Sequence, residues 1–209
     1  MRKKLIVPVL ICLVTLVIYA AGRSEGKVEV ERDGAGEIVV TLSEPDRTPL
    51  IEGDALRKTH KHHEAIVSYQ NVLDRDGVDT EVRAEAQYNI GLSYTWLGEY
   101  NEAEAVFEKM LDTYKDNPNA VGYAEYYLAW LEIQKEKYHG AIKRLQRSLD
   151  TKTITDRELS ARTQFMIGRI YFNFLHNNEK ANKAFVKVLS QYPETKIANH
   201  AYLDYFRNK

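Results

Sequence analysis

Three histidines lie within four positions in the stretch HKHHEA, residues 60–65, and Glu64 follows them directly. Imidazole nitrogens are common metal ligands, and His60 and His63 are three residues apart, so they could share one face of a helix. A structural zinc ion takes four ligands. No second cluster of His, Cys, Asp or Glu in the sequence has a spacing that would complete such a site. The pattern therefore favours a solvated turn, with His60, His62 and His63 as the only metal candidates.

The sequence offers no catalytic constellation and no cofactor site. Its one cysteine, Cys12, lies in an apolar N-terminal run, which argues against a disulfide within the chain and against a thiol enzyme. GxSxG is absent, and DGAG at 33–36 lacks the lysine and the helix of a phosphate-binding loop. The formal net charge of −1 argues against a general nucleic-acid binder. We therefore predict a protein that is not an enzyme, uses no cofactor and binds no nucleic acid.

The N-terminal residues have the pattern of an export segment. A basic start at residues 2–4 precedes an uncharged run at residues 5–22, and AAG at 20–22 offers small residues for cleavage. An apolar run of about 17 residues is also near the lower limit for spanning a bilayer. Residues 1–22 are therefore interpreted either as a cleaved signal peptide or as a hydrophobic helix that anchors the protein in the inner membrane. In both cases we expect the rest of the chain to be exported to the periplasm of a bacterial envelope.

The chain repeats itself after residue 48. LGEYNEAEAVFEKML (97–111) aligns with KEKYHGAIKRLQRSL (135–149), THKHHEAIVSYQNVL (59–73) and LHNNEKANKAFVKVL (175–189). A fixed period of this length indicates a tandem array of small structural units. The aligned alanines are Ala65, Ala103, Ala141 and Ala181, separated by 38, 38 and 40 residues. A second aligned element precedes the copies at 97–111, 135–149 and 175–189, and its small residues are Gly91, Ala129 and Gly168.

The spacing inside each element predicts helices. Ile90, Tyr94 and Leu97 follow the i, i+4, i+7 pattern of one helix face. Small residues at the aligned positions would let two helices cross closely. Thr155 and Glu158 have the spacing of a capping box, which predicts a helix start at that point. Each copy is therefore expected to be a pair of antiparallel helices.

The stretch NIGLSYTWLGEYNEAEAVFEKML resembles the tetratricopeptide repeat family, and the resemblance covers residues 49–206. It implies an all-α, right-handed solenoid of antiparallel helix pairs, with about four repeats and a terminal capping helix at KIANHAYLDYF (196–206). The long period is similar to that of bacterial envelope members such as the outer-membrane assembly lipoproteins and the Tol–Pal accessory protein. The residues that carry the signature are Gly91, Tyr94, Gly98, Tyr100, Ala103 and Phe107.

Some copies depart from this pattern at their turns. His60 replaces the glycine that the second copy has as Gly98, and Glu136 replaces it in the third copy. The third copy also has Glu132 where the pattern has an aromatic residue, and the fourth has one extra residue within FLHNN. The alignment thus places the histidine cluster in a turn between two helices.

Residues 23–48 differ in character from the repeats. Val28 and Val30 alternate with charged residues, DGAG supplies turn residues, and residues 38–42 are mostly β-branched. This pattern predicts a short β-hairpin over residues 27–42, with an extended linker as the alternative. We therefore divide the chain into an export segment (1–22), a linker (23–48) and a repeat domain (49–209).

The resemblance implies that the first helix of each pair lines a concave groove. Aromatic residues and an arginine lie on the stripe that would face it, and such residues dominate peptide-binding surfaces. The predicted function is therefore a scaffold or adaptor that binds a protein or peptide partner in an envelope complex and contacts the membrane only through its N-terminal segment. The alternatives are a structural protein that self-associates through the terminal helix, or metal binding at the histidine cluster. The predicted groove residues are Tyr88, Leu92, Trp96, Tyr123, Tyr126, Trp130, Phe165, Arg169, Phe172 and Asn173.

Overall fold

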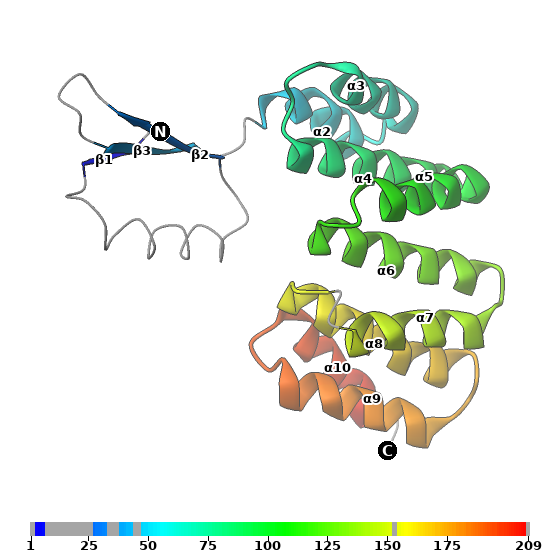
Figure 1. Ribbon diagram of the computed structural model, residues 1–209. Helices are drawn as coiled ribbons and strands as arrows, with labels where there is room; N and C mark the ends of the chain where they lie inside the picture. Colours follow the sequence, from blue (N-terminus) through cyan, green and yellow to red (C-terminus); the bar gives the residue numbers. More distant parts are fainter. Residues whose placement is uncertain (1–2, 7–26, 33–37, 44–46, 152–153, 208–209) are drawn as a thin grey trace.

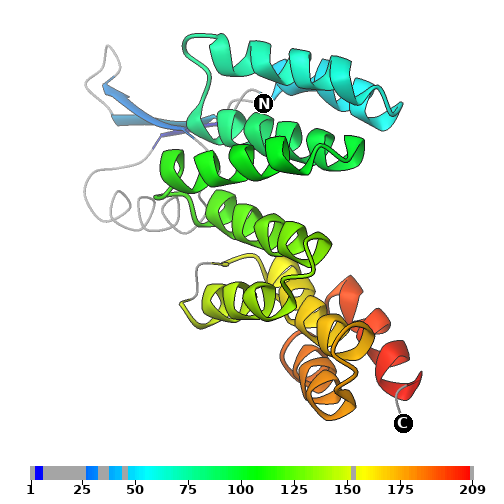
Figure 2. The same cartoon turned by 90° about the vertical axis from the view of Figure 1, so that its right-hand side faces the viewer.

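The structure is a computed structural model that describes residues 3–6, 27–32, 38–43, 47–151 and 154–207. Within these residues, nine α-helices stack in chain order, from the cyan first pair to the red terminal helix (Figures 1 and 2). They form four antiparallel pairs, α2/α3 to α8/α9, followed by the single helix α10. The predicted all-α array of four repeats with a terminal helix is confirmed.

A short 3₁₀ helix, η1 (Thr48–Leu50), leads into the array. The α-helices are α2 (Ile51–Lys58), α3 (His62–Asp74), α4 (Thr80–Leu97), α5 (Tyr100–Thr113), α6 (Pro118–Gln134), α7 (Tyr138–Asp150), α8 (Arg157–Asn173), α9 (Asn178–Gln191) and α10 (Lys196–Arg207).

Three short strands precede the helices: β1 (Lys3–Ile6), β2 (Lys27–Arg32) and β3 (Ile38–Ser43), paired antiparallel in the order β1-β3-β2. The predicted hairpin stays a prediction, because residues 33–37, which would form its turn, lie outside the described residues. The predicted N-terminal hydrophobic helix also stays a prediction, since residues 7–26 lie outside them as well. Among the helices that are described, none is long and apolar enough to cross a membrane.

The two helices of a pair cross where a ring of the second helix lies directly on a small residue of the first. At Gly91, an added Cβ would lie 2.6 Å from Cε1 of Phe107, a distance that real Cβ atoms do not adopt. The first and fourth pairs have the same contact, with 2.4 Å at Gly53 and at Gly168. The third pair has a leucine in place of the ring, and there an alanine fits. The facing residues are Gly53 with Tyr69, Gly91 with Phe107, and Gly168 with Phe185. Ala129 and Leu145 stand at the corresponding positions of the third pair and are buried in one cluster.

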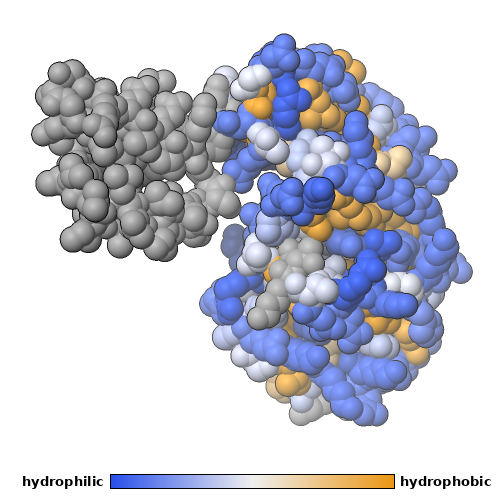
Figure 3. Space-filling view, in the orientation of Figure 1, coloured by the Kyte–Doolittle hydropathy of each residue, from blue (hydrophilic) through white to orange (hydrophobic). Residues whose placement is uncertain are grey.

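The apolar core runs along the whole array in clusters that join each pair to the next. The four alanines that align the repeats, Ala65, Ala103, Ala141 and Ala181, are all fully buried. On the face drawn in Figure 3, the surface of the helices is mostly hydrophilic, and apolar side chains emerge in patches between them. Burial of the aligned alanines confirms that the sequence period marks the helix crossings.

Helix α10 covers the end of the fourth pair. It packs on α8 and α9, and its Ala198 and Ala201 are buried in a cluster with aromatic residues of those helices. Tyr205 is half-buried in the same cluster, whereas Tyr202 and Phe206 are 53% exposed. The predicted capping role of this helix is confirmed: its two alanines are buried, and Tyr205 adds a half-buried ring to the contact.

Side chains cap the starts of several helices. The carboxylate of Asp156 accepts a hydrogen bond from the backbone N–H three residues later (2.9 Å), and Asn117 does the same at the start of α6 (3.1 Å). The predicted capping box at Thr155 is therefore wrong by one residue. Thr155 instead donates to the side chain of Asn119 (3.0 Å). Both residues offer an oxygen, and the ionised carboxylate is the stronger acceptor.

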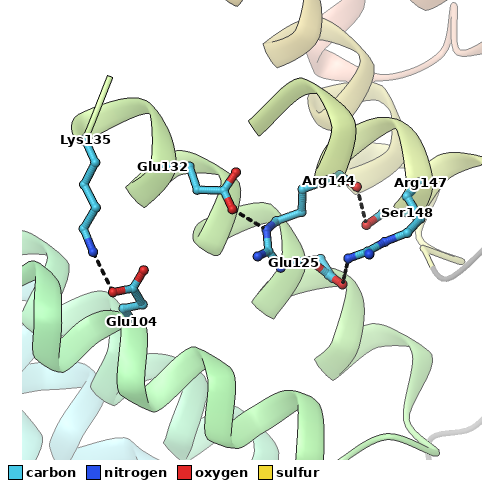
Figure 4. Close-up of polar contacts among 7 residues, drawn as sticks. All are labelled: Glu104, Glu125, Glu132, Lys135, Arg144, Arg147 and Ser148. Atoms are coloured by element: carbon cyan, nitrogen blue, oxygen red, sulfur yellow. Dashed lines mark hydrogen bonds and ion pairs between the residues drawn. The ribbon is translucent and has the colours of Figure 1, made fainter. Parts of the chain in front are cut away.

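Ion pairs explain why the third pair tolerates Glu132. Arg144 of α7 donates through Nε to Glu132 (2.9 Å) and through Nη1 to Glu125 (2.7 Å), both on α6 (Figure 4). Lys135 joins α6 to Glu104 of α5 (2.6 Å). Although burial lowers the pKa of Arg144, hydrogen bonds to the two carboxylates raise it above its ordinary value. Ion pairs thus form part of the contact between α6 and α7, at a position where other pairs have an aromatic residue.

The crossing geometry makes a testable prediction about coupling. We expect Gly91→Ala to lower the free energy of unfolding by about 1–3 kcal/mol, because the new methyl group overpacks against the Phe107 ring. Adding Phe107→Leu should recover about 1 kcal/mol or more of this loss, since the double variant reproduces the Ala/Leu contact of the third pair. Urea unfolding of the two single variants and the double variant measures the coupling.

The matched control is Phe185→Leu, the same substitution in the fourth pair. The combination of Phe185→Leu with Gly91→Ala should change the free energy of unfolding by the sum of the two single effects, because Phe185 contacts Gly168 instead. Equal coupling energies for the two combinations would contradict the proposed contact.

Candidate functional site

The histidine cluster lies where α2 turns into α3. His60 has a left-handed backbone conformation (φ 62°), whereas His62 and His63 belong to the first turn of α3. The other three turns have a residue with the same conformation at the same place: Gly98 (φ 78°), Glu136 (φ 57°) and His176 (φ 49°). His60 therefore occupies the glycine position of a repeated turn, as the alignment predicted.

One backbone hydrogen bond closes each of these turns. Lys61 N–H donates to the carbonyl of Leu56 (3.0 Å), five residues back, and Lys137 N–H donates to that of Glu132 in the same way (2.8 Å). In the fourth turn the bond spans six residues, from Asn177 to Tyr171 (2.8 Å). The longer span accommodates the extra residue that the sequence shows there.

His62 uses its ring for packing. The ring is stacked on Trp96 of α4, with centroids 6.1 Å apart and planes 3° apart. Burial, then the nearby His60, Arg57 and His63, lower the pKa of His62, so the neutral ring is favoured. At the same position in the next two pairs a tyrosine begins the second helix and contacts an aromatic residue of the following helix. These contacts are Tyr100 with Trp130 (5.8 Å between centroids) and Tyr138 with Phe174 (4.7 Å).

Across the described ranges, no three His, Cys, Asp or Glu side chains converge in a way that could hold a metal ion. Within the cluster, the ring of His60 meets that of His62 edge-on at 5.9 Å, and His63 is exposed. These contacts support the turn interpretation of the cluster rather than a metal site.

Two hollows lie on the first helices of successive pairs. The larger, here called the basic hollow, has a volume of about 500 Å³ and is lined by α6, α8 and α10. Its lining includes Tyr126, Trp130, Ile133, Phe165, Arg162, Arg169 and Asn173. The smaller, here called the acidic hollow, has a volume of about 340 Å³. Its lining includes Arg47, Glu81, Glu85, Tyr88, Tyr123 and Asp156.

The hollows bring together most of the predicted groove residues. Tyr126, Trp130, Phe165, Arg169 and Asn173 line the basic hollow, and Tyr88 and Tyr123 line the acidic one. The other three predicted residues lie elsewhere. Leu92 is a core residue (8% exposed), Phe172 is half-buried in the cluster of the last pair, and Trp96 is exposed beside His62.

The charged residues at the ends of the hollows were missed by the sequence prediction. Glu81 and Glu85 continue the stripe of Tyr88 towards the start of α4, and Arg162 continues that of Arg169 on α8. A stripe extended by one turn on α8 and by two turns on α4 would have found them. Arg47, from the segment before η1, has no repeat counterpart, so periodicity could not predict its place.

Several contacts define the walls of the hollows. The ring of Tyr88 packs on Tyr123 (5.0 Å between centroids) and joins the second pair to the third. Burial, then the neighbouring Tyr127, raises the pKa of Tyr126 to about 12, so its phenol remains a hydrogen-bond donor. The guanidinium of Arg169 lies 5.9 Å from the ring centre of Phe165. Aromatic faces next to guanidinium groups have the chemistry of a binding surface.

Family comparisons assign the helical array. Two models described as tetratricopeptide repeat match the chain, one over residues 82–154 and the other over residues 162–195. The chain is a tetratricopeptide repeat protein. Domains of this family typically mediate protein–protein interactions and are usually non-catalytic. None of the curated proteins compared with the chain matches it in sequence.

Solved structures share the fold at low sequence identity. The apo form of RapI superposes with a TM-score of 0.63 at 15% identity and covers 77% of this chain, which in turn spans only 46% of RapI. BtubC (BKLC) from P. vanneervenii has a TM-score of 0.62 at 14% identity, covering 75% of this chain and 68% of its own. MamA has a TM-score of 0.50 at 22% identity, and the match covers 75% of this chain and 91% of MamA. These similarities concern the fold alone.

The left-handed turn makes a prediction about the histidine cluster. We expect His60→Gly to raise the free energy of unfolding by about 0.5–1 kcal/mol, because glycine adopts positive φ without the steric cost of a side chain. Glu136→Gly should act alike. The control is His63→Gly within α3, which should lower it by about 1 kcal/mol. Urea unfolding compares them, and a loss at position 60 as large as that at position 63 would contradict the turn assignment.

Proposed function

We propose that this tetratricopeptide repeat protein is a non-catalytic adaptor whose basic hollow binds a segment of a partner protein. The observation that carries the proposal is the composition of the basic hollow. Tyr126 and Trp130, both partly exposed, offer aromatic surface near the guanidinium groups of Arg162 and Arg169, in a volume of about 500 Å³ whose lining also includes the buried Phe165. Aromatic and arginine side chains provide most of the binding energy in protein interfaces.

We also propose that the partner is part of a bacterial cell-envelope complex. The support comes from the sequence, in which a basic start precedes the uncharged residues 5–22, as in export signals and inner-membrane anchors. The repeat period of 38 residues adds to it, since it is similar to that of the Tol–Pal accessory protein and the outer-membrane assembly lipoproteins. The repeat domain would then act in the periplasm, either released by cleavage or anchored by its N-terminal segment.

In-cell photocross-linking tests the binding surface. A photoreactive amino acid at Gln134, which is exposed and lines the basic hollow, should cross-link a specific protein, and one at the exposed Gln146 of α7 should not. We expect Trp130→Ala to reduce the cross-link at least tenfold, because loss of a central tryptophan typically costs about 2 kcal/mol or more. Trp96→Ala is the matched control, since Trp96 is exposed outside both hollows. An undiminished cross-link in Trp130→Ala, at equal abundance, would refute the proposal.

A second candidate function is self-association through α10. Tyr202, Leu203 and Phe206 are 53–54% exposed on this terminal helix, and such apolar side chains often mark interfaces. In this case the native mass in solution should be that of an oligomer, and Leu203→Asp should reduce it to that of a monomer. Light scattering of both proteins distinguishes this candidate, and a monomeric wild type at micromolar concentration would eliminate it.

A further inference from the structure

The two hollows lie one after the other along α6 and α8. Helix α6 contributes to both, with Tyr123 in the acidic hollow and Tyr126, three residues later, in the basic hollow. Helix α8 also spans them, because Asp156 at its start lines the acidic hollow and Arg162 and Arg169 line the basic one. A ligand that follows these helices therefore passes from one hollow into the other.

The acidic end has an excess of carboxylates. Glu81, Glu85 and Asp156 line it, and Arg47 is the only base in its lining. Burial raises the pKa of Glu85, although the neighbouring Arg47 opposes this shift. Arg47 itself donates a hydrogen bond to Glu85. The chain's own arginine thus shows that this end accepts a guanidinium group.

The basic end is lined by arginines instead of carboxylates. Arg162 and Arg169 line it, and no carboxylate is among its lining residues. Each arginine has one acidic neighbour outside this lining. Glu158 accepts from Arg162 at 3.2 Å, and Asp204 is 3.9 Å from Arg169, longer than a hydrogen bond. Both arginine side chains are about half exposed (49% and 53%) and can reach a ligand carboxylate.

We propose that the two hollows form one groove, which binds a protein segment that carries basic residues at one end, acidic residues at the other and apolar or aromatic residues between them. This inference rests on the proposed binding function and specifies the ligand. Complementary charges at both ends set the direction of a bound segment, and the reversed arrangement would place like charges together at each end.

The length of the segment follows from α8. Asp156 precedes Arg162 by six residues and Arg169 by thirteen, which correspond to about 9 and 20 Å along a helix that rises about 1.5 Å per residue. An extended peptide covers this distance in about three to six residues. The opposite charges of the ligand should therefore be about three to six residues apart in an extended segment.

Selection from a displayed library of random 12-residue peptides, with the purified full chain as bait, tests this inference. Peptides selected by the wild type should carry opposite charges on either side of apolar residues. The variant Arg162→Glu/Arg169→Glu should instead select peptides that are basic at both ends, and it should bind the wild-type peptides at least tenfold more weakly. The matched control is Lys143→Glu/Lys187→Glu, which reverses two exposed charges on α7 and α9 and should leave selection unchanged.

The variant Arg162→Gln/Arg169→Gln is the control for an effect of the Glu substitutions on folding. It should abolish the preference for acidic residues without creating one for basic residues, and its circular dichroism should match that of the wild type. Selected peptides that require Trp130 but show no charge order, and that bind the Glu variant as tightly as the wild type, would overturn this inference and leave the proposed function intact. Failure to select any peptide that requires Trp130 would overturn both.

Discussion

The array depends on the close crossing of the two helices in each pair. A bulky side chain of the second helix lies on a residue of the first that has at most a methyl group, sixteen residues earlier in the first three pairs. This contact determines how closely the helices approach and buries the large side chain completely. Since every pair presents the next with a similar surface, one local rule, repeated four times, produces the whole stack.

The same rule explains how much of the fold the sequence predicts. The buried alanines and the small residues at the crossings recur at nearly constant spacing, so alignment of the chain with itself locates the pairs. Gly53 was missed because α2 has only eight residues and a weak pattern, although it lies sixteen residues before Tyr69, as Gly91 lies before Phe107. The cap of α8 is Asp156 and not Thr155, a difference that depends on single hydrogen bonds. Periodicity carries no information about such bonds.

The sequence predicts which residues share a stripe of each first helix, but not which of them line a common surface. Tyr126, Trp130 and Arg169 line one hollow, because they lie on first helices that follow one another in the stack. Helical spacing failed for Leu92 and Trp96, whose surroundings depend on how far each pair is rotated against the next. It also could not anticipate Arg47, which comes from outside the repeats and meets Glu85 only in the folded chain.

The opposite charges of the groove follow from its construction. First helices of successive pairs run in the same direction (Figure 1), so their N-termini lie along one side of the groove. Acidic residues are favoured there. Asp156 accepts a hydrogen bond from a free backbone N–H of α8, and Glu81 lies in the first turn of α4, near the positive end of the helix dipole. The dipole offsets part of their charge, but its effect fades after the first turn. Glu85, one turn further along α4, lies beyond the reach of the dipole and pairs instead with the guanidinium of Arg47.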